Sequence, residues 1–405
     1  MALLSERGDI LEPFTLGEKS DDIARTFLDS GTFGFIPDVP TAYTQPLYSF
    51  FLIPLYAAFG RSWPVVGGAQ ILVAIATALI VYEIGRRWIS AAAGVGGALL
   101  ATLHPYVIWH DVHVNRELLD GLLAAAVMFL TLALTDRRSV ALAAAFGGTL
   151  GLAILGNVRL SALPLVLLAF LLWHWRLDRR SLALGALVLA TCAAVLVPWV
   201  VRNHESVGCF ALTTDARALW EANNPRTLDT LRAGRFLDNV PLPPSLPPSA
   251  QDAGREYRRH GQVVRVDECR QMRFYQREVL DFWRDQPGEK ALLAGQATLM
   301  LWSPTVSPPE SDTSGWVSRL RKSIEPAYML PLFALAVLGL WHVPRRVAAL
   351  SLLLLAYQWG VAMIFVGATR YRVPWDFVLA LLAASALAGL LARRAQRVPA
   401  PVPES

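Results

Sequence analysis

Long apolar segments recur through most of this chain, and they constrain its fold more than any other feature. An α-helix needs roughly 17 to 25 mostly apolar residues to cross the hydrocarbon core of a bilayer. Nine segments reach or approach that length, at residues 64–85, 90–108, 116–135, 140–156, 160–175, 181–200, 326–342, 348–367 and 373–392. Because lipid offers no partner for backbone polar groups, such segments must be helical. The sequence therefore predicts an all-α, multi-span integral membrane protein.

The composition supports this prediction and argues against other classes. The chain is 54% hydrophobic and 17% charged, which is unlike a soluble globular protein. Its formal net charge of +5 does not indicate nucleic acid, because the arginines lie at the ends of apolar segments and not on one polar face. The basic character is better explained by membrane topology.

Arginines lie at alternate ends of the predicted spans. Because positive residues concentrate on the cytoplasmic side of membrane proteins, these ends are predicted to be cytoplasmic. They carry Arg86, Arg87, Arg137, Arg138, Arg176, Arg179, Arg180, Arg345, Arg346, Arg393, Arg394 and Arg397. The expected organisation is an outer first loop at 1–63, six spans in 64–201, an outer region at 202–325, three spans in 326–392 and a cytoplasmic tail at 393–405.

The outer position of the first loop requires something to translocate it. No signal peptide and no sufficiently long apolar run precedes Pro64. We therefore expect either a further span upstream of Met1 or unaided translocation of the first 63 residues, which is rarer.

Two shorter apolar segments are predicted to lie at the outer surface, the first as an interfacial helix and the second as a re-entrant or interfacial helix. Residues 46–59 are too short to cross and contain Pro54, and residues 290–302 are bounded by polar outer sequence. Counting 290–302 as a tenth span would place Arg345 outside, against the positive-inside tendency. Between them, the proline-rich run at 240–250 is typical of an extended loop, and a helix is expected at 271–284.

Residues 17–35 are predicted to form an interfacial helix on the outer side. Apolar residues recur at helical spacing, and charged residues occupy the opposite side. The apolar face is Ile23, Ala24, Phe27 and Leu28, and the polar face is Glu18, Asp21, Asp22, Arg25 and Asp29. The carboxylates are either a solvated face that complements the helix dipole or groups placed for chemistry.

Positive residues also occur on the outer side, where topology disfavours them. Arg370 and Arg372 flank Tyr371 at the outer start of the last span. Guanidinium groups suit phosphate oxygens, although both side chains could instead extend to lipid headgroups. Arg116 and Arg159, at other outer ends, are weaker candidates for the same role.

Histidines, cysteines and tryptophans in the outer segments allow further interpretations. His110, Asp111, His113 and Glu117 are close in sequence, but their spacing matches no defined ligand motif, so no metal site is predicted. Cys209 and Cys269 are either disulfide-bonded or free thiols. Possible sugar-stacking platforms, or simply parts of an interfacial aromatic belt, are Trp109, Trp220, Trp302 and Trp375.

Several of these segments together resemble a known family. They are GEKSDDIARTFLDSGTFGF at 17–35 with its continuation to 60, HPYVIWHDVHVNRELLDGLLAA at 104–125, PWVVRNHESVGCFALTTDARALWEANNP at 198–225 and TRYRVPWD at 369–376. Their order resembles the outer loops of GT-C glycosyltransferases of the protein-mannosyltransferase-like and aminoarabinose-transferase-like group. The resemblance implies a GT-C-like bundle of about nine transmembrane helices with outer interfacial helices and a small extracytoplasmic domain.

The resemblance also implies a function and a set of site residues. The expected activity is transfer of a sugar from a polyprenyl-phosphate carrier to an acceptor hydroxyl, with inversion, at the extracytoplasmic face of a bacterial inner membrane. Glu18 matches the catalytic acid of the family's first loop, but the usual Asp is replaced by Glu followed by Lys, so Asp21 and Asp22 stay as candidates. The implied substrate-binding residues are Arg370, Tyr371, Arg372, Arg159, Arg116 and Glu117.

The implied partners are the lipid-linked sugar, an unknown glycan, lipid or protein acceptor, and membrane lipids, with no nucleic acid and no cofactor. Two alternatives remain: a lipid or solute transporter or flippase, and a non-catalytic partner subunit. A transporter would normally place ionisable residues near the bilayer midplane, whereas here the charges lie at membrane edges.

Overall fold

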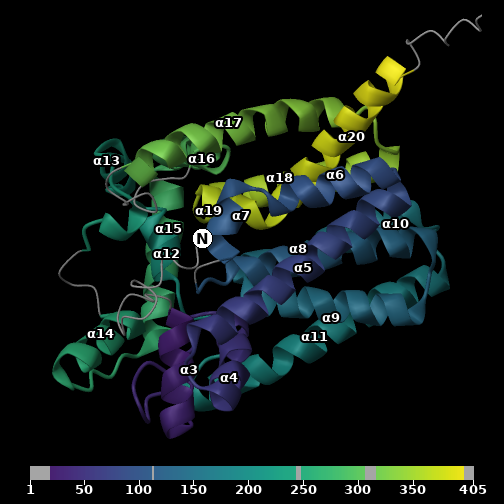
Figure 1. The fold of residues 1–405 in the computed structure, drawn as a ribbon. Helices are drawn as coiled ribbons and strands as arrows, with labels where there is room; N and C mark the ends of the chain where they lie inside the picture. Colours follow the sequence, from purple (N-terminus) through teal and green to yellow (C-terminus); the bar gives the residue numbers. More distant parts are fainter. Residues whose placement is uncertain (1–18, 112–113, 243–247, 306–315, 396–405) are drawn as a thin grey trace, which may run out of the picture.

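The computed structural model describes residues 19–111, 114–242, 248–305 and 316–395 (Figure 1). Within these ranges the chain is helical, and the one β-type contact is an isolated bridge between Ile36 and Val39. Glu18, which was predicted to be catalytic, lies outside the described residues. So do the side chains of His110, Asp111 and His113.

A bundle of helices that run side by side across Figure 1 forms the body of the molecule. Within the described ranges, a helix lies at the place of each of the nine predicted spans. They are α5 (Trp63–Trp88), α6 (Ala91–Thr102), α8 (Glu117–Asp136), α9 (Val140–Gly156), α10 (Leu163–His174), α11 (Arg179–Val207), α17 (Trp316–Gly339), α18 (Arg345–Ile364) and α20 (Asp376–Ala395).

Five helical segments among the described residues are long and apolar enough to cross a bilayer: α5, α8, α11, α18 and the segment Thr369–Ala392 that includes α20. Shorter apolar helices include α6 and α9. The prediction of an all-α, multi-span membrane protein is confirmed, whereas the count of nine spans stays a prediction.

Small residues let neighbouring helices approach closely. A Cβ added to Gly147 of α9 would clash with the carbonyl oxygen of Val188 in α11, and one added to Gly94 of α6 would lie 2.6 Å from the carbonyl oxygen of Tyr82 in α5. In lipid, where no hydrophobic force drives helices together, such close backbone contact is a main source of association energy. These glycines therefore fix the pairing of α9 with α11 and of α5 with α6.

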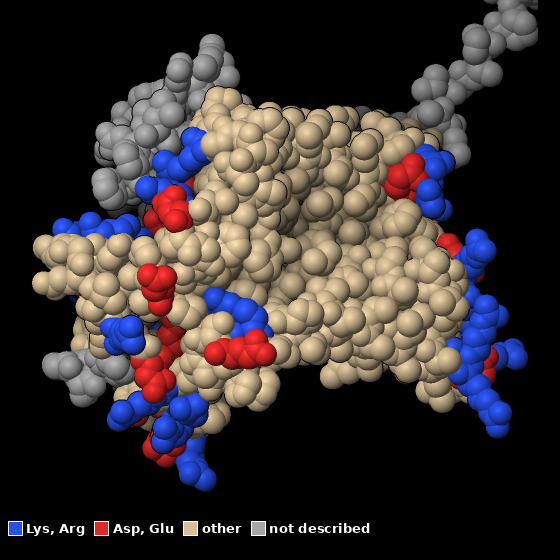
Figure 2. Space-filling view, turned by 90° about the horizontal axis from the view of Figure 1, so that it is seen from below, with Lys and Arg blue, Asp and Glu red and all other residues tan. Residues whose placement is uncertain are grey.

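Charged side chains gather towards two opposite ends of the face shown in Figure 2, and the surface between them is mostly uncharged. At one end, loops that are distant in sequence are linked by ion pairs: Arg138 Nη1 lies 2.9 Å from Asp178 Oδ2, and Arg346 pairs with Asp136. Trp88 Nε1 also donates to Asp136, at 2.6 Å. The predicted arginine-rich ends thus lie together, as alternating spans require. That these ends face the cytoplasm stays a prediction.

Shorter helices cover the other end of the bundle, with the small outer region on the same side (Figure 1). They are α3 (Lys19–Ser30), α4 (Leu47–Phe59), α7 (Pro105–Asp111), α12 (Arg217–Glu221), α13 (Thr227–Arg232), α14 (Ala250–His260), α15 (Glu268–Asp285), α16 (Pro287–Leu301) and α19 (Thr369–Arg372). The described chain also contains three one-turn 3-10 helices: η1 (Val158–Leu160), η2 (Leu237–Asn239) and η3 (Val373–Trp375). The helix expected at 271–284 lies within α15, and α4 and α16 occupy the two segments predicted to be interfacial.

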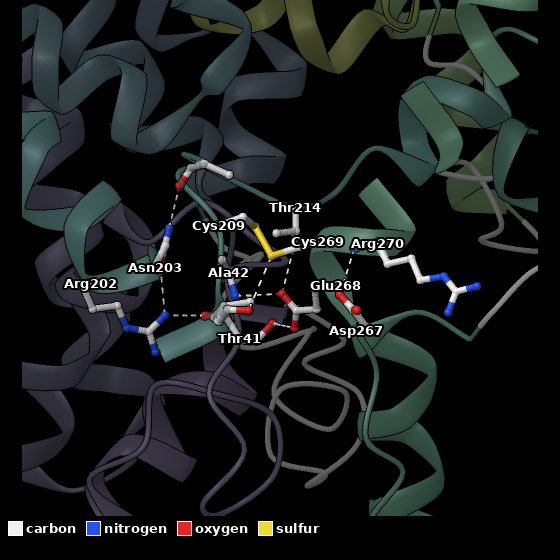
Figure 3. Close-up of a disulfide and its surroundings, with 12 residues drawn as sticks. Thr41, Ala42, Arg202, Asn203, Cys209, Thr214, Asp267, Glu268, Cys269 and Arg270 are labelled. Carbon is white, nitrogen blue, oxygen red and sulfur yellow. Dashed lines mark hydrogen bonds between the residues drawn. A yellow bond between two sulfur atoms is a disulfide. The ribbon is translucent and has the colours of Figure 1, made fainter. Parts of the chain in front are cut away.

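A disulfide joins Cys209, just after α11, to Cys269 in the first turn of α15, with a Cα–Cα distance of 6.0 Å (Figure 3). Of the two alternatives that the sequence leaves open, the structure has the bonded one. The neighbouring Glu268 carboxylate accepts hydrogen bonds from the backbone N–H of Ala42, at 2.9 Å, and from the hydroxyl of Thr214, at 2.7 Å. The disulfide therefore lies beside the contact that holds the first outer loop against the outer region.

Arg202 strengthens this contact from the end of α11 (Figure 3). Its Nη1 donates to the carbonyl of Thr41 at 2.7 Å, and its Nη2 donates to that of Phe33 at 2.9 Å. The next residues of the loop, Tyr43 to Gln45, reach the cavity described below. The position of these cavity residues consequently depends on α11, on Glu268 and on the disulfide.

Candidate functional site

A cavity of about 510 Å³ lies where the bundle meets the outer region. Residues from the first outer loop, the starts of α3 and α8, η1, α12, α14 and α19 line it. Its charged lining residues are Lys19, Arg116, Arg159, Asp215, Arg217, Glu221, Asp252, Arg255 and Arg370. The size is that of a typical small-molecule site.

Three arginines from separate elements meet on the bundle side of this cavity. Arg116 immediately precedes α8, Arg159 lies in η1, and Arg370 lies in α19. Tyr371 also lines the cavity, and the Arg159 guanidinium carbon lies 3.6 Å from the centroid of its ring. We call Arg116, Arg159, Arg370 and Tyr371 the arginine wall.

Local structure explains how these side chains are held. Arg370 Nε and Nη2 lie 2.8 and 2.7 Å from the same oxygen of Glu117, which is in the first turn of α8, where a carboxylate complements the helix dipole. Arg116 Nη1 donates to Gln45 Oε1 at 2.7 Å. Asn157 caps η1 by accepting from the backbone N–H of Arg159, at 3.3 Å, and its side-chain N–H donates to Asp120, at 3.2 Å.

The arginine wall can bind an anion. Arg159 Nη1 is buried and has no hydrogen-bond partner among the residues that the structure describes. A buried donor without a protein partner is uncommon in a folded protein, and Arg159 Nη1 can therefore donate to a ligand. Guanidinium groups bind phosphate oxygens through charge-assisted hydrogen bonds. The wall therefore suits a phosphate group.

The opposite, outer side of the cavity carries both signs of charge. Arg217 Nε lies 2.8 Å from Glu221 Oε1, and its Nη1 lies 2.6 Å from Asp252 Oδ2. Asp252 is held by a capping box with Ser249 at the start of α14. Lys19 Nζ lies 3.6 Å from Asp215 Oδ2. We call Lys19, Asp215, Arg217, Glu221 and Asp252 the outer wall.

Burial in the outer wall changes proton affinities. It raises the pKa of Glu221 to about 7, although the Arg217 guanidinium opposes this shift. Burial alone would also raise the pKa of Asp252. The hydrogen bonds of Asp252 with Ser249 and its ion pair with Arg217 outweigh the effect of burial, so the pKa of Asp252 is lowered. Glu221 is thus a carboxyl group that titrates near neutral pH in a cavity.

Asp21 and Asp22, the two candidate bases of the first loop that the structure describes, are engaged elsewhere. Asp21 is buried and accepts from Tyr56 Oη at 2.6 Å and from Arg61 Nε and Nη2 at 3.0 Å each. Asp22 Oδ2 lies 2.6 Å from Arg258 Nη1, and burial raises its pKa. Neither lines the cavity, whereas Lys19 does. Of the two alternatives that the sequence leaves open for the carboxylates, a solvated face is wrong for Asp21, which is buried and has its charge compensated by Arg61 and Tyr56.

Arg372 does not line the cavity either. It is 1% exposed, and its Nε donates to Asp376 Oδ1 at 2.9 Å, while its Nη1 donates to the carbonyl of Leu301 at 2.7 Å. His104 Nε2 lies 3.1 Å from Asp376 Oδ2. Arg372 was predicted to bind phosphate or to extend to lipid headgroups, but a carboxylate four residues later and the end of α16 hold it inside the protein, away from the cavity.

The three candidate tryptophans whose side chains the structure describes do not form a platform at the cavity. Trp220 is 5% exposed and packs near Tyr275, and Trp375 is 3% exposed in the bundle core. Trp302 packs edge-on against Phe333 and Trp359. The side chain of Trp109 lies outside the described residues. Aromatic rings at the cavity come instead from Tyr43, Phe365 and Tyr371.

Comparisons with known proteins agree with this architecture. Residues 40–201 match the family model described as dolichyl-phosphate-mannose-protein mannosyltransferase. No curated protein matches the sequence significantly. Among solved structures, the archaeal oligosaccharyltransferase AglB from Archaeoglobus fulgidus, in complex with an inhibitory peptide and a dolichol-phosphate, has a TM-score of 0.53 at 14% identity. The alignment covers 95% of this chain and 48% of AglB.

The chain has a GT-C glycosyltransferase fold. The resemblance predicted from the sequence is confirmed at this level. A second GT-C structure, ArnT from Cupriavidus metallidurans bound to undecaprenyl phosphate, aligns over 95% of this chain and 76% of its own, with 18% identity and a TM-score of 0.39. The chain spans about half the length of AglB.

The outer wall was not predicted as a site. Asp215, Arg217 and Glu221 lie inside the segment 198–225 that was noted for its resemblance, but no spacing within it signals a cavity. Asp252 comes from a different helix, α14. Only the packing of α12 and α14 beside the first loop brings these residues together.

Proposed function

We propose that this GT-C protein transfers a sugar from a polyprenyl-phosphate carrier to an acceptor hydroxyl, with inversion, at the extracytoplasmic face of a bacterial inner membrane. The observation that carries the proposal is the arginine wall, in which three guanidinium groups from separate elements converge on one cavity. A phosphate is the leaving group of this reaction, and cations that contact its oxygens stabilise the negative charge that develops as it departs.

The donor class is supported by the names of similar proteins. The matching family model is described by a dolichyl-phosphate-linked mannose, and the AglB structure contains a dolichol-phosphate. The cavity lies at the end of the bundle opposite the arginine-rich loops, which places it on the outer side if those loops are cytoplasmic. These points favour a lipid-phosphate donor over a soluble one.

In the proposed reaction, the oxygen of the acceptor hydroxyl attacks the anomeric carbon, and the bond from that carbon to the phosphate oxygen breaks. The electron pair leaves with the lipid phosphate, next to the arginine wall, and a carboxylate takes the hydroxyl proton. Glu18 is our proposed base, because it matches the family's first-loop acid and directly precedes Lys19, which lines the cavity. Asp21 and Asp22 are less favoured, because both carboxylates pair with arginines.

The test is a transfer assay with the purified protein and defined lipid-linked sugars, which follows both the sugar and the released lipid phosphate. Transfer from at least one donor is expected. Binding of the lipid without transfer would instead indicate a flippase or a non-catalytic subunit, and neither binding nor transfer would overturn the proposal.

Glu18→Gln tests the proposed base. The amide keeps the shape but cannot accept a proton, so we expect the transfer rate to fall by roughly a hundredfold to ten-thousandfold while stability changes by about half a kcal/mol. Asp21→Asn and Asp22→Asn are the parallel variants. Asp21→Asn should mainly lower thermal stability, because Arg61 loses its charged partner. Full activity of Glu18→Gln would assign the base elsewhere.

A further inference from the structure

One fully buried side chain, Asn223, links the parts of the chain that carry the two walls of the cavity. Asn223 follows α12, which contributes to the outer wall. Its amide contacts the end of α18 at Ile364. From there the chain continues through the cavity-lining Phe365 to α19, which carries Arg370 and Tyr371 of the arginine wall. The relative position of the two walls therefore depends on this contact.

The Asn223 amide uses its full hydrogen-bonding capacity. Its Nδ2 donates to the carbonyl of Leu219 in α12, at 2.7 Å, and to that of Ile364 in α18, at 3.0 Å. Its Oδ1 accepts from Trp283 Nε1 of α15, at 2.9 Å, and from Lys290 Nζ of α16, at 2.5 Å. A side-chain amide has two donor hydrogens and two acceptor lone pairs, so each of them is used here. One side chain thus connects α12, α15, α16 and α18.

The bonds to α18 satisfy backbone groups that the helix cannot satisfy by itself. The last four carbonyls of an α-helix have no partner within the helix. At the end of α18, Asn223 binds the carbonyl of Ile364, and Lys290 Nζ donates to that of Met363 at 2.7 Å. The charge of Lys290 also complements the negative end of the helix dipole. The contact is therefore specific for this end of α18.

Apolar packing beside this contact reaches the arginine wall. Ala222 forms a buried cluster with Val366, which lies between α18 and α19, and Tyr371 packs against that cluster. The guanidinium carbon of Arg159 lies 5.7 Å from the centroid of the Phe365 ring. The end of α12 is consequently attached to residues that contact the arginine wall.

We infer that Asn223 is a positioning residue that sets how the outer wall faces the arginine wall. The inference rests on the proposed function, because only a substrate that reaches beyond the arginine wall depends on the position of the opposite side. In that function, the lipid phosphate contacts the arginine wall, and the sugar and the acceptor occupy the rest of the cavity. A misplacement of about 1 Å in such a site can lower the rate by about a hundredfold.

The experiment compares the sugar donor with the lipid phosphate that remains after transfer. In Asn223→Ala, which loses all four hydrogen bonds, kcat/KM for the polyprenyl-phosphate sugar should fall by roughly tenfold to a hundredfold. The Kd for polyprenyl phosphate without a sugar should stay unchanged, because the arginine wall keeps its own support from the bundle, where Glu117 of α8 pairs with Arg370. A general loss of stability would not separate these two quantities.

Asn224→Ala is the matched control. Asn224 is also buried, but within the described chain its hydrogen bonds stay inside residues 220–226. Its Nδ2 donates to the carbonyl of Trp220 at 2.8 Å, and its Oδ1 accepts from the backbone N–H of Arg226 at 2.9 Å. Asn224→Ala should lower thermal stability and leave kcat/KM for the donor unchanged.

Lys290 provides a second test if Asn223→Ala does not fold. Lys290→Met removes the donor to Met363 and to Asn223, so it should lower kcat/KM for the sugar donor and leave the Kd for polyprenyl phosphate unchanged. Lys290→Arg keeps a charged donor and should restore part of the lost activity.

Three results would overturn the inference while wild-type transfer still supports the proposed function. They are unchanged donor kinetics in Asn223→Ala and Lys290→Met, an equal loss of donor use and of polyprenyl-phosphate binding, and the same loss of donor use in Asn224→Ala. Absence of transfer by the wild type would overturn the proposed function and the inference with it, so the two failures are distinguishable.

Discussion

At the scale of single residues, the arginines near the last outer loop differ in what they contact, although the sequence places them two positions apart. Arg370 lines the cavity and pairs with Glu117, while Arg372 is buried against Asp376. Arg159 lines the cavity with a buried Nη1 that lacks a partner within the described ranges. Removing each charge should therefore have a different consequence.

Arg159→Ala is the clearest test of phosphate binding, because it does not leave a buried carboxylate without its ion pair. Loss of one or two charge-assisted hydrogen bonds to phosphate should weaken donor use by roughly tenfold or more. Steady-state kinetics with varied donor would measure this, and direct binding of the free lipid phosphate should weaken in parallel. Arg159→Lys keeps the charge and should retain part of the affinity. Unchanged donor kinetics in Arg159→Ala would remove Arg159 from the site.

Arg372→Ala should act on stability. Among the described residues it leaves the buried Asp376 with His104 as its remaining polar partner, and breaking a buried ion pair on one side costs about 3 to 5 kcal/mol. We expect a clearly lowered midpoint of thermal unfolding, measured in detergent. The matched variant Arg370→Ala should lower both stability, through Glu117, and donor use. A stable Arg372→Ala protein with weakened donor binding would place Arg372 in the site.

At the scale of elements, the outer region is connected to the first loop through one end of α15. The disulfide from Cys269 fixes the segment after α11, and the adjacent Glu268 binds Thr41, Ala42 and Thr214. Burial raises the pKa of Glu268, although its three hydrogen bonds oppose the shift. The loop residues that follow, Tyr43 to Gln45, line the cavity. The contacts of Glu268 and the disulfide therefore position part of the site.

Breaking this disulfide should weaken the contact between the first loop and the outer region. Cys209→Ser, Cys269→Ser and the double variant should each lose roughly 2 to 4 kcal/mol, since the bond closes a loop with a sequence separation of 60 residues. The measurement is thermal unfolding with and without a reductant: the wild type should respond to reduction, and the three variants that lack the bond should not. Cys192→Ala is the control, because Cys192 is a buried free thiol. Alkylation of Cys209 in the unreduced native protein would contradict the bond.

At the scale of the whole molecule, a mostly uncharged surface separates two charged ends on the face shown in Figure 2. Ion pairs gather the arginine-rich loops at one end, and the cavity with its two walls lies at the other. If the arginine-rich end is cytoplasmic, the cavity opens on the side where a lipid-linked sugar would be used.

A topology experiment tests this orientation. A reporter fused after Arg138 or Arg346 is expected to be cytoplasmic, and one inserted between residues 203 and 287 is expected to be extracytoplasmic. Cysteine-labelling of the same positions in intact cells provides an independent measurement. Cytoplasmic labelling of the proline-rich segment at 240–250 would reverse both the orientation and the proposed face of the reaction.

The sequence by itself determined the membrane fold, because span length and hydropathy act locally: a segment such as 181–200 is apolar enough to require a bilayer whatever its neighbours are. It also pointed to Arg116, Arg159 and Arg370, since a positive charge at an outer end of a span is unusual wherever the helix packs. Their shared cavity, however, appears only when η1, α8 and α19 pack together.

Only the tertiary structure decided whether the remaining charged side chains are buried and which partners they contact. Whether Asp21 is solvated or buried depends on Arg61, forty residues away in sequence, and whether Arg372 faces outward depends on Asp376 and the end of α16. Glu221 has no distinctive sequence context, and its raised pKa comes from its burial in the folded protein. Burial and ion pairing join residues that are distant along the chain, and local periodicity contains no information about such partners.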